Sequence, residues 1–154
     1  MVLKGYITTL PLFGENVPQS VQNLVIRDYC QKNKLDFLLS AVEYNYPKKH
    51  LVLKTILNDL NKLDGIVFYS LFQLPSNNTQ RKSVFSKVID NKKEMHFALE
   101  NIVVKKLENI NRVENIWKVR ATISSCPSGE LIRSSLKQVQ YTDNNFKDNR
   151  NGQH

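Results

Sequence analysis

The chain has 154 residues, of which 41% are hydrophobic and 23% charged, a composition typical of one globular domain. No stretch approaches the roughly 20 apolar residues that span a bilayer. The first residues, MVLKGYITTLPLF, lack a sustained apolar region and a small-residue cleavage site, so we expect a cytoplasmic protein without membrane insertion. The net charge of +8 permits nucleic acid, anionic lipid or phosphorylated partners, but it is evenly spread, and solvated helix faces explain it more simply.

Strand and helix patterns alternate along the chain. Strands are predicted at 5–10, 36–44, 66–74 and 94–104, and helices at 18–33, 47–63, 79–91 and 106–124. In the first helix, Val21, Leu24, Val25 and Tyr29 recur at helical spacing and are expected to face the core. The alternation predicts an α/β fold in three layers, with a parallel sheet of four or five strands between helices and a carboxyl-terminal helix.

The stretch LDGIVFYSLFQLP at 63–75 is the predicted centre of the sheet. A continuous apolar run between turn signals is typical of a strand that is buried on both faces. We predict a single domain over residues 1–126. The polar segment 127–154 is expected to be an irregular or partly disordered tail.

Cysteine and histidine do not form a recognisable metal or redox motif. Cys30 and Cys126 show no CxxC spacing, and His50, His96 and His154 are scattered. His96 lies in an apolar strand pattern and fits a hydrogen-bonded core histidine better than a ligand. The sequence also lacks the phosphate-binding GxxxxGK[ST] loop, the GxGxxG fingerprint and the GxSxG elbow, so we predict no cofactor and no metal.

Polar residues gather where the predicted strands end. Because parallel strands open their carboxyl ends onto one edge, where α/β folds bind ligands, we predict a site there. The candidate catalytic residues are Glu43, Ser70 and Tyr69, and the candidate substrate-binding residues are Thr8, Thr9, Gln19, Asn45, Gln73, Arg81 and Glu100. In an enzyme, Glu43 would be the general base and Arg81 would hold an anionic group at a helix start. Alternatively, Ser70 satisfies a backbone group, and Glu43 and Arg81 are solvated charges.

Several segments resemble the catalytic domain of serine recombinases. These are Tyr6-Ile7, a first helix with Gln19, Gln22 and Tyr29-Cys30, and the strand that begins at Asp64. The resemblance spans about residues 5–104 and implies a resolvase-like or flavodoxin-like fold. That family places a nucleophilic serine and an arginine just after the first-strand tyrosine. Here Thr8, Thr9 and Leu10 follow, so the resemblance carries over the fold only.

Longer blocks resemble a bacterial family, the sporadic carbohydrate cluster proteins. The matching segments are Gly5–Ile7, Val17–Gln19, Gln22–Cys30 and Asp64–Pro75. The resemblance implies a genomic setting of surface-polysaccharide or lipopolysaccharide O-antigen assembly. It brings no reaction and no catalytic residue with it.

Three hypotheses follow. The first is a cytoplasmic accessory protein or small enzyme of O-antigen or capsule synthesis. It would bind a polar or phosphorylated sugar-pathway metabolite at the carboxyl edge of the sheet. The second is a recombinase-derived DNA-binding or regulatory protein without the nucleophilic serine, with steeply salt-dependent DNA binding. The third is a non-catalytic scaffold, a homodimer or higher oligomer joined through the helix at 107–117, where Ile110 and Trp117 lie on an apolar stripe.

Overall fold

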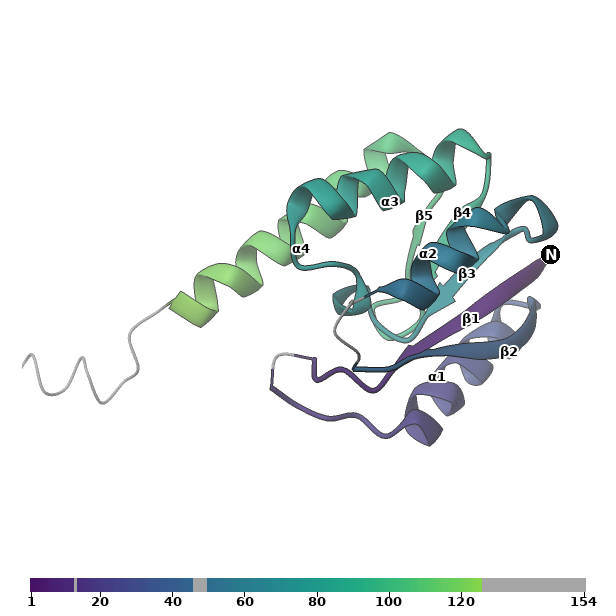
Figure 1. The fold of residues 1–154 in the computed structure, drawn as a ribbon, viewed down its shortest axis with the longest axis horizontal. Helices are drawn as coiled ribbons and strands as arrows, with labels where there is room; N and C mark the ends of the chain where they lie inside the picture. The colour runs from purple at the N-terminus through teal and green to yellow at the C-terminus, as the bar shows by residue number, and fades with distance from the viewer. Residues whose placement is uncertain (13, 46–49, 126–154) are drawn as a thin grey trace, which may run out of the picture. The chain divides into compact units, whose positions relative to one another are not determined.

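A five-stranded sheet in the order β2-β1-β3-β4-β5 organises the fold (Figure 1). The computed structural model describes residues 1–12, 14–45 and 50–125. The strands are β1 (Val2–Thr8), β2 (Asp36–Glu43), β3 (Gly65–Phe68), β4 (Glu94–Phe97) and β5 (Ile102–Val104). β1 pairs in parallel with β2 and β3, β3 pairs in parallel with β4, and β5 runs antiparallel to β4. The α/β fold with a sheet of five strands is therefore confirmed, but the sheet is mixed rather than wholly parallel because β5 returns antiparallel to β4.

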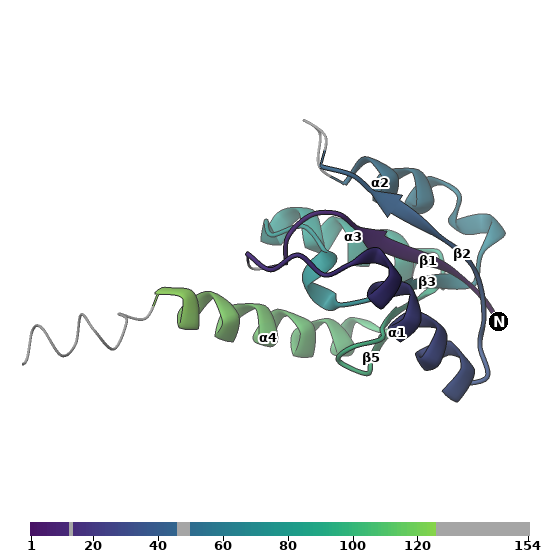
Figure 2. The ribbon, with the colours of Figure 1, turned by 90° about the horizontal axis from the view of Figure 1, so that it is seen from below.

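Helices cover both faces of the sheet. They are α1 (Gln19–Lys32), α2 (Leu51–Asn58), α3 (Asn78–Asp90) and α4 (Leu107–Ser125), with short 3-10 turns η1 (Leu60–Lys62) and η2 (Leu71–Gln73). α1 lies on one face, and α2 and α3 lie on the other (Figures 1 and 2). The expected three layers and the carboxyl-terminal helix are thus present.

The chain divides within α4 into a compact unit, Met1–Asn115, and a second unit that begins at Ile116. The tail expected at 127–154, like Cys126, lies outside the described residues, and the domain boundary after residue 126 stays a prediction. Over the described ranges, no helix combines the length and the apolar character that a membrane span requires.

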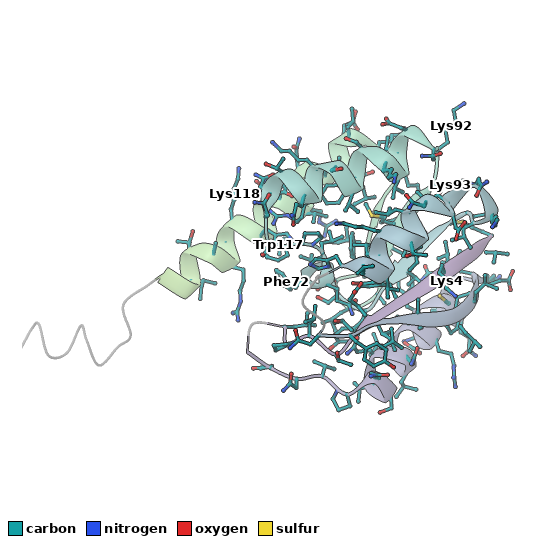
Figure 3. The ribbon with its side chains drawn as sticks, in the orientation of Figure 1. Lys4, Phe72, Lys92, Lys93, Trp117 and Lys118 are labelled. Carbon is teal, nitrogen blue, oxygen red and sulfur yellow. The ribbon has the colours of Figure 1, made fainter. Side chains whose placement is uncertain are left out.

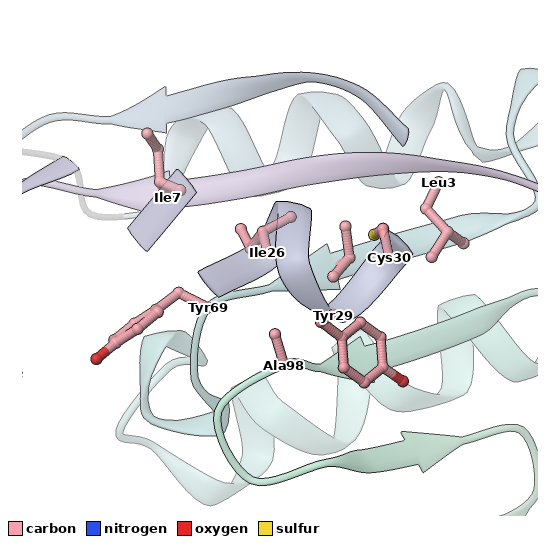
Figure 4. Close-up of a cluster of buried hydrophobic side chains, with 8 residues drawn as sticks. Leu3, Ile7, Ile26, Tyr29, Cys30, Tyr69 and Ala98 are labelled. Carbon is pink, nitrogen blue, oxygen red and sulfur yellow. The ribbon is translucent and has the colours of Figure 1, made fainter. Parts of the chain in front are cut away.

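The α1 side of the sheet buries an apolar cluster that includes Leu3, Ile7, Ile26 and Cys30 (Figure 4). Cys30 is a buried free cysteine, and burial raises the pKa of its thiol to about 11. Two of the four positions expected to face the core do not. Val21 is 41% exposed and Leu24 is 63% exposed.

The buried face of α1 is instead formed by Gln22, Ile26, Tyr29 and Cys30. The helix is rotated relative to the prediction because the polar side chain of Gln22 points inward, where its amide is hydrogen-bonded. The spacing of apolar residues alone cannot identify a buried polar residue such as Gln22.

Aromatic rings fill the opposite side of the sheet. The ring centroids of Tyr6 and Phe68 lie 5.2 Å apart, and those of Phe68 and Phe97 lie 5.3 Å apart. Alternate residues of a strand point to opposite faces, so Tyr6 packs with the aromatic rings and Ile7 packs in the α1-side cluster.

The edge strand β2 carries an irregularity opposite Gly5. The pairing register of β1 and β2 shifts between Lys4 and Tyr6, which inserts one extra residue into β2. A Cβ at position 5 would collide with the Oγ of Ser40, so glycine is needed at this close approach. Leu39, within the bulged segment, is 88% exposed.

The central strand is shorter than predicted. The apolar run at 66–74 was expected to be one strand, but β3 ends at Phe68 and η2 follows at Leu71. Ser70 ends the extended segment because its side chain caps η2. Its Oγ accepts a hydrogen bond from the Phe72 amide, and Gln73 completes a capping box. Likewise, the single strand expected at 94–104 is a hairpin of β4 and β5, whose turn includes Asn101 at φ 51°.

Candidate functional site

Two buried glutamines connect the carboxyl ends of β1 and β3. Gln22 Oε1 accepts from the Thr8 amide at 3.0 Å, and Gln22 Nε2 donates to the Thr8 carbonyl at 2.8 Å. Gln73 Nε2 then donates to Gln22 Oε1 at 2.9 Å. The side chains join α1, β1 and η2 into one hydrogen-bonded unit at the predicted site edge.

A second part of this network surrounds Ser70. Its hydroxyl donates to Glu100 Oε1 at 2.6 Å, and its amide donates to Gln73 Oε1 at 3.1 Å. The Leu71 amide donates to Glu100 Oε2 at 3.1 Å. Burial raises the pKa of the Glu100 carboxyl, and burial together with the nearby Glu100 charge raises the pKa of Tyr69. The Ser70 hydroxyl thus donates to a carboxylate while it accepts from the Phe72 amide.

Glu43 caps the amino terminus of α2. Its carboxylate accepts from the backbone amides of Leu51 at 3.0 Å and Leu53 at 3.1 Å. It also accepts from the Tyr6 hydroxyl at 3.2 Å, and burial, followed by the Glu43 charge, raises the pKa of Tyr6. A carboxylate is favoured at a helix amino terminus, where free amides and the dipole attract negative charge. Both oxygens of the predicted base are therefore already engaged.

Arg81 forms a buried ion pair rather than a surface charge. Its Nε and Nη2 donate to the two oxygens of Glu114 at 2.9 and 2.8 Å. Its Nη1 donates to the carbonyls of Pro75 and Ser76 at 3.0 and 2.6 Å. The guanidinium thus ties α3 to the loop before it and to the first part of α4.

The structure brings together six of the predicted site residues and leaves four apart. Thr8, Thr9, Glu43, Ser70, Gln73 and Glu100 belong to connected hydrogen bonds at the carboxyl edge. Gln19 begins α1, Asn45 is exposed beyond β2, and Tyr69 packs into the α1-side cluster (Figure 4). Within the described ranges, no hydrogen bond joins these three to the network. The roles in catalysis and substrate binding stay predictions.

Sequence reasoning missed a groove between α2 and α3. It measures about 400 Å³ and is lined by polar residues that include Lys54 and Lys87. The available signal was helical spacing, because Gln80, Ser83 and Lys87 share one face of α3. No motif drew attention to it, since neither helix shows a family signature there.

A buried polar chain around His96 is the other feature of note. His96 Nδ1 lies 2.9 Å from the Tyr29 hydroxyl, and Nε2 lies 3.1 Å from Glu94 Oε2. Lys105 pairs with the other Glu94 oxygen at 2.9 Å. His96 is thus a hydrogen-bonded core histidine, as its apolar strand pattern indicated. In the part of the chain that the structure describes, no three His, Cys, Asp or Glu side chains cluster as a metal site would require.

Comparisons with known proteins identify the fold. No family model matches the chain, and no curated protein matches it. Among solved structures, it is similar to the N-terminal catalytic domain of TP901-1 integrase, with a TM-score of 0.53 and 14% sequence identity over 79% of this chain and 95% of that one. Nothing in the comparisons supports the carbohydrate cluster family. At this identity the likeness concerns the fold alone, and the chain has a resolvase-like α/β fold.

Proposed function

We propose that this chain is a recombinase-derived nucleic-acid-binding or regulatory protein that does not use a serine nucleophile. The observation that carries the proposal is the fold likeness to an integrase catalytic domain, which covers 79% of the chain. The net charge of +8 agrees with a polyanionic partner.

The hydroxyl groups at the end of β1 support a function that does not use them as nucleophiles. The Thr8 hydroxyl accepts from the Leu10 amide at 2.9 Å and donates to the Glu43 carbonyl at 3.4 Å. The Thr9 hydroxyl donates to the same carbonyl at 3.3 Å. Both hydroxyls therefore stabilise the chain turn after β1, and the residue that follows them is an apolar leucine.

Exposed lysines supply candidate phosphate contacts. Lys92 lies at the turn between α3 and β4 (Figure 3), Lys106 lies just before α4, and both side chains are exposed. Among the described residues, neither of these two lysines forms an ion pair, whereas Lys32 and Lys62 pair with Asp28 and Asp59. The two groups of lysines can therefore be compared at equal change in net charge.

Fluorescence anisotropy with a labelled DNA duplex tests the proposal. The affinity should fall steeply between 50 and 200 mM salt, with a log–log slope of about −0.9 per phosphate contact. The variant K92Q/K106Q should bind more weakly and lose about 0.9 of slope for each contact removed. The control K32Q/K62Q, which removes the same number of positive charges, should keep most of the affinity.

No denaturant-resistant protein–DNA adduct should form, because no serine nucleophile follows β1. Absence of DNA binding at low salt, or an affinity that salt does not alter, would contradict the proposal. A covalent adduct would replace it with a catalytic function.

A sugar-pathway metabolite at the sheet edge has less support. The groups that would bind it are already hydrogen-bonded: Glu43 accepts from the Leu51 amide, the Ser70 amide donates to Gln73, and the Ser70 hydroxyl donates to Glu100. A ligand there would have to break those contacts before it could use the side chains.

A further inference from the structure

The groove between α2 and α3 combines an apolar floor with a polar rim. Leu53, Leu57 and Val84 are buried and line it from the two helices. Its volume of about 400 Å³ falls within the range of small-molecule sites, which are mostly apolar with a few placed polar groups. The space is thus larger than a single inorganic ion needs.

The charge at the rim has one sign. Lys54 from α2 and Lys87 from α3 line the groove, and no aspartate or glutamate does so among the described residues. Within those residues, neither lysine forms an ion pair. Lys87 Nζ donates to Asn58 Oδ1 at 2.7 Å, which connects the helices across the groove.

Neutral hydrogen-bonding groups continue the rim along α3. Gln80 and Ser83 precede Lys87 by seven and four residues, so the three project from one side of the helix. An amide and a hydroxyl beside two ammonium groups can donate to phosphate oxygens or to ligand hydroxyls.

We propose that this groove binds a small phosphate monoester, with the phosphate between Lys54 and Lys87 and its organic part on the Leu53–Leu57–Val84 floor. Lysine binds phosphate as a compact point charge, which suits two flexible side chains that approach from facing helices. The proposal adds a small-molecule site to the proposed nucleic-acid function and does not depend on it.

Isothermal titration calorimetry with defined probes tests the proposal. The probes are uridine 5′-monophosphate and glucose 1-phosphate, with uridine, glucose and inorganic phosphate as controls at constant ionic strength. At least one monoester should bind at least about tenfold more tightly than its unphosphorylated parent and than inorganic phosphate. Comparison of the nucleotide with the sugar phosphate shows which of the two kinds of monoester the groove prefers.

Two pairs of variants locate the binding. K54Q/K87Q should weaken it at least about tenfold, and the equal-charge control K62Q/K82Q should leave it unchanged. Ser83→Trp should fill the groove and abolish binding. Ser86→Trp places the same bulk at an exposed α3 position that does not line the groove, and should have no effect.

Equal binding of parent and monoester, no binding of either monoester, or equal loss in groove and control variants would overturn the proposal. If K54Q/K87Q weakens DNA binding more than K62Q/K82Q while no monoester binds, the groove would be part of the nucleic-acid surface instead. Loss of DNA binding with intact monoester binding would contradict the proposed function alone.

Discussion

Glu43 is the residue at which a helix-capping role can be tested most directly against the predicted role as a general base. Its carboxylate accepts from the Leu51 and Leu53 amides and from the Tyr6 hydroxyl. Glu43→Gln removes the charge and presents an NH₂ group to a backbone donor. We expect a loss of about 1–3 kcal/mol in the free energy of unfolding, because a buried donor loses its acceptor. Urea denaturation followed by circular dichroism measures it.

The matched control is Glu15→Gln, at an exposed carboxylate, which should change stability by less than about 0.5 kcal/mol. An unchanged stability for Glu43→Gln would mean that the cap contributes little and would return Glu43 to its predicted role as a base.

His96 predicts a specific pH dependence. A carboxylate only accepts hydrogen bonds, so Nε2 donates to Glu94, and Nδ1 accepts from the Tyr29 hydroxyl. Burial lowers the pKa of His96, although the Glu94 charge opposes this and Lys105 adds to it. Burial therefore favours the neutral form of the imidazole in the fold.

Because the folded pKa of His96 is below the unfolded value of about 6.5, the unfolded chain binds more protons as the pH falls. The free energy of unfolding should decrease as the pH drops below that value. His96→Gln offers an amide donor and a carbonyl acceptor in place of a titrating ring, so its decrease should be smaller. Urea midpoints from pH 7.5 to 5.5 compare the two proteins, and parallel curves would refute this account.

At the scale of elements, Arg81 and Glu114 join α3 to α4. Arg81→Met leaves the Glu114 carboxylate buried without its partner and should cost about 3–5 kcal/mol. The double variant R81M/E114L should recover much of that loss, since it removes both charges together. Chemical denaturation of the wild type, R81M, E114L and R81M/E114L gives the coupling energy between the two side chains.

The exposed pair of Lys32 and Asp28 is the comparison. Asp28→Asn should cost less than about 1 kcal/mol, as exposed pairs contribute little. A mild effect of Arg81→Met, similar to that of Asp28→Asn, would show that Arg81 can leave Glu114 and is available to an anion.

The sequence predicted elements better than the contacts between them. Alternating patterns located the four parallel strands and the helices, because burial of apolar faces is local information. The end of β3 at Phe68 was missed, since Ser70 and Gln73 act through capping hydrogen bonds that hydrophobicity does not record. The Arg81–Glu114 pair joins residues 33 positions apart, so no spacing rule could find it.

At the scale of the candidate site, strand ends correctly placed Thr8, Glu43, Ser70 and Glu100 at one edge. Their hydrogen-bond partners were not predictable, because a side-chain contact such as that of Gln22 with the Thr8 amide leaves no trace in the apolar spacing of a helix. The sequence therefore predicted a ligand site at the carboxyl edge of the sheet. In the structure, the polar side chains at that edge are hydrogen-bonded to each other and to the backbone.

At the scale of the whole molecule, α4 is the candidate surface for self-association. Val119 is 60% exposed and Ile123 is 57% exposed, and residues four apart share a helix face. If the helix joins copies of the chain, Val119→Asn/Ile123→Asn should shift the protein toward monomer. Sedimentation velocity measures the shift, and circular dichroism confirms an unchanged fold.

Leu24→Asn is the control, since Leu24 is equally exposed but belongs to α1. A monomeric wild type at all concentrations would refute association through α4. Equal shifts for both variants would indicate nonspecific loss of exposed apolar surface.

The extra residue in β2 also bears on how the protein avoids fibril growth. β2 is an outermost strand, and the unpaired amides and carbonyls of such a strand can recruit the sheet of another copy. The register shift opposite Gly5 interrupts the regular ladder that an incoming strand would need. Deleting Leu39 would straighten that border, and the shortened protein should form thioflavin-positive aggregates sooner than the parent chain.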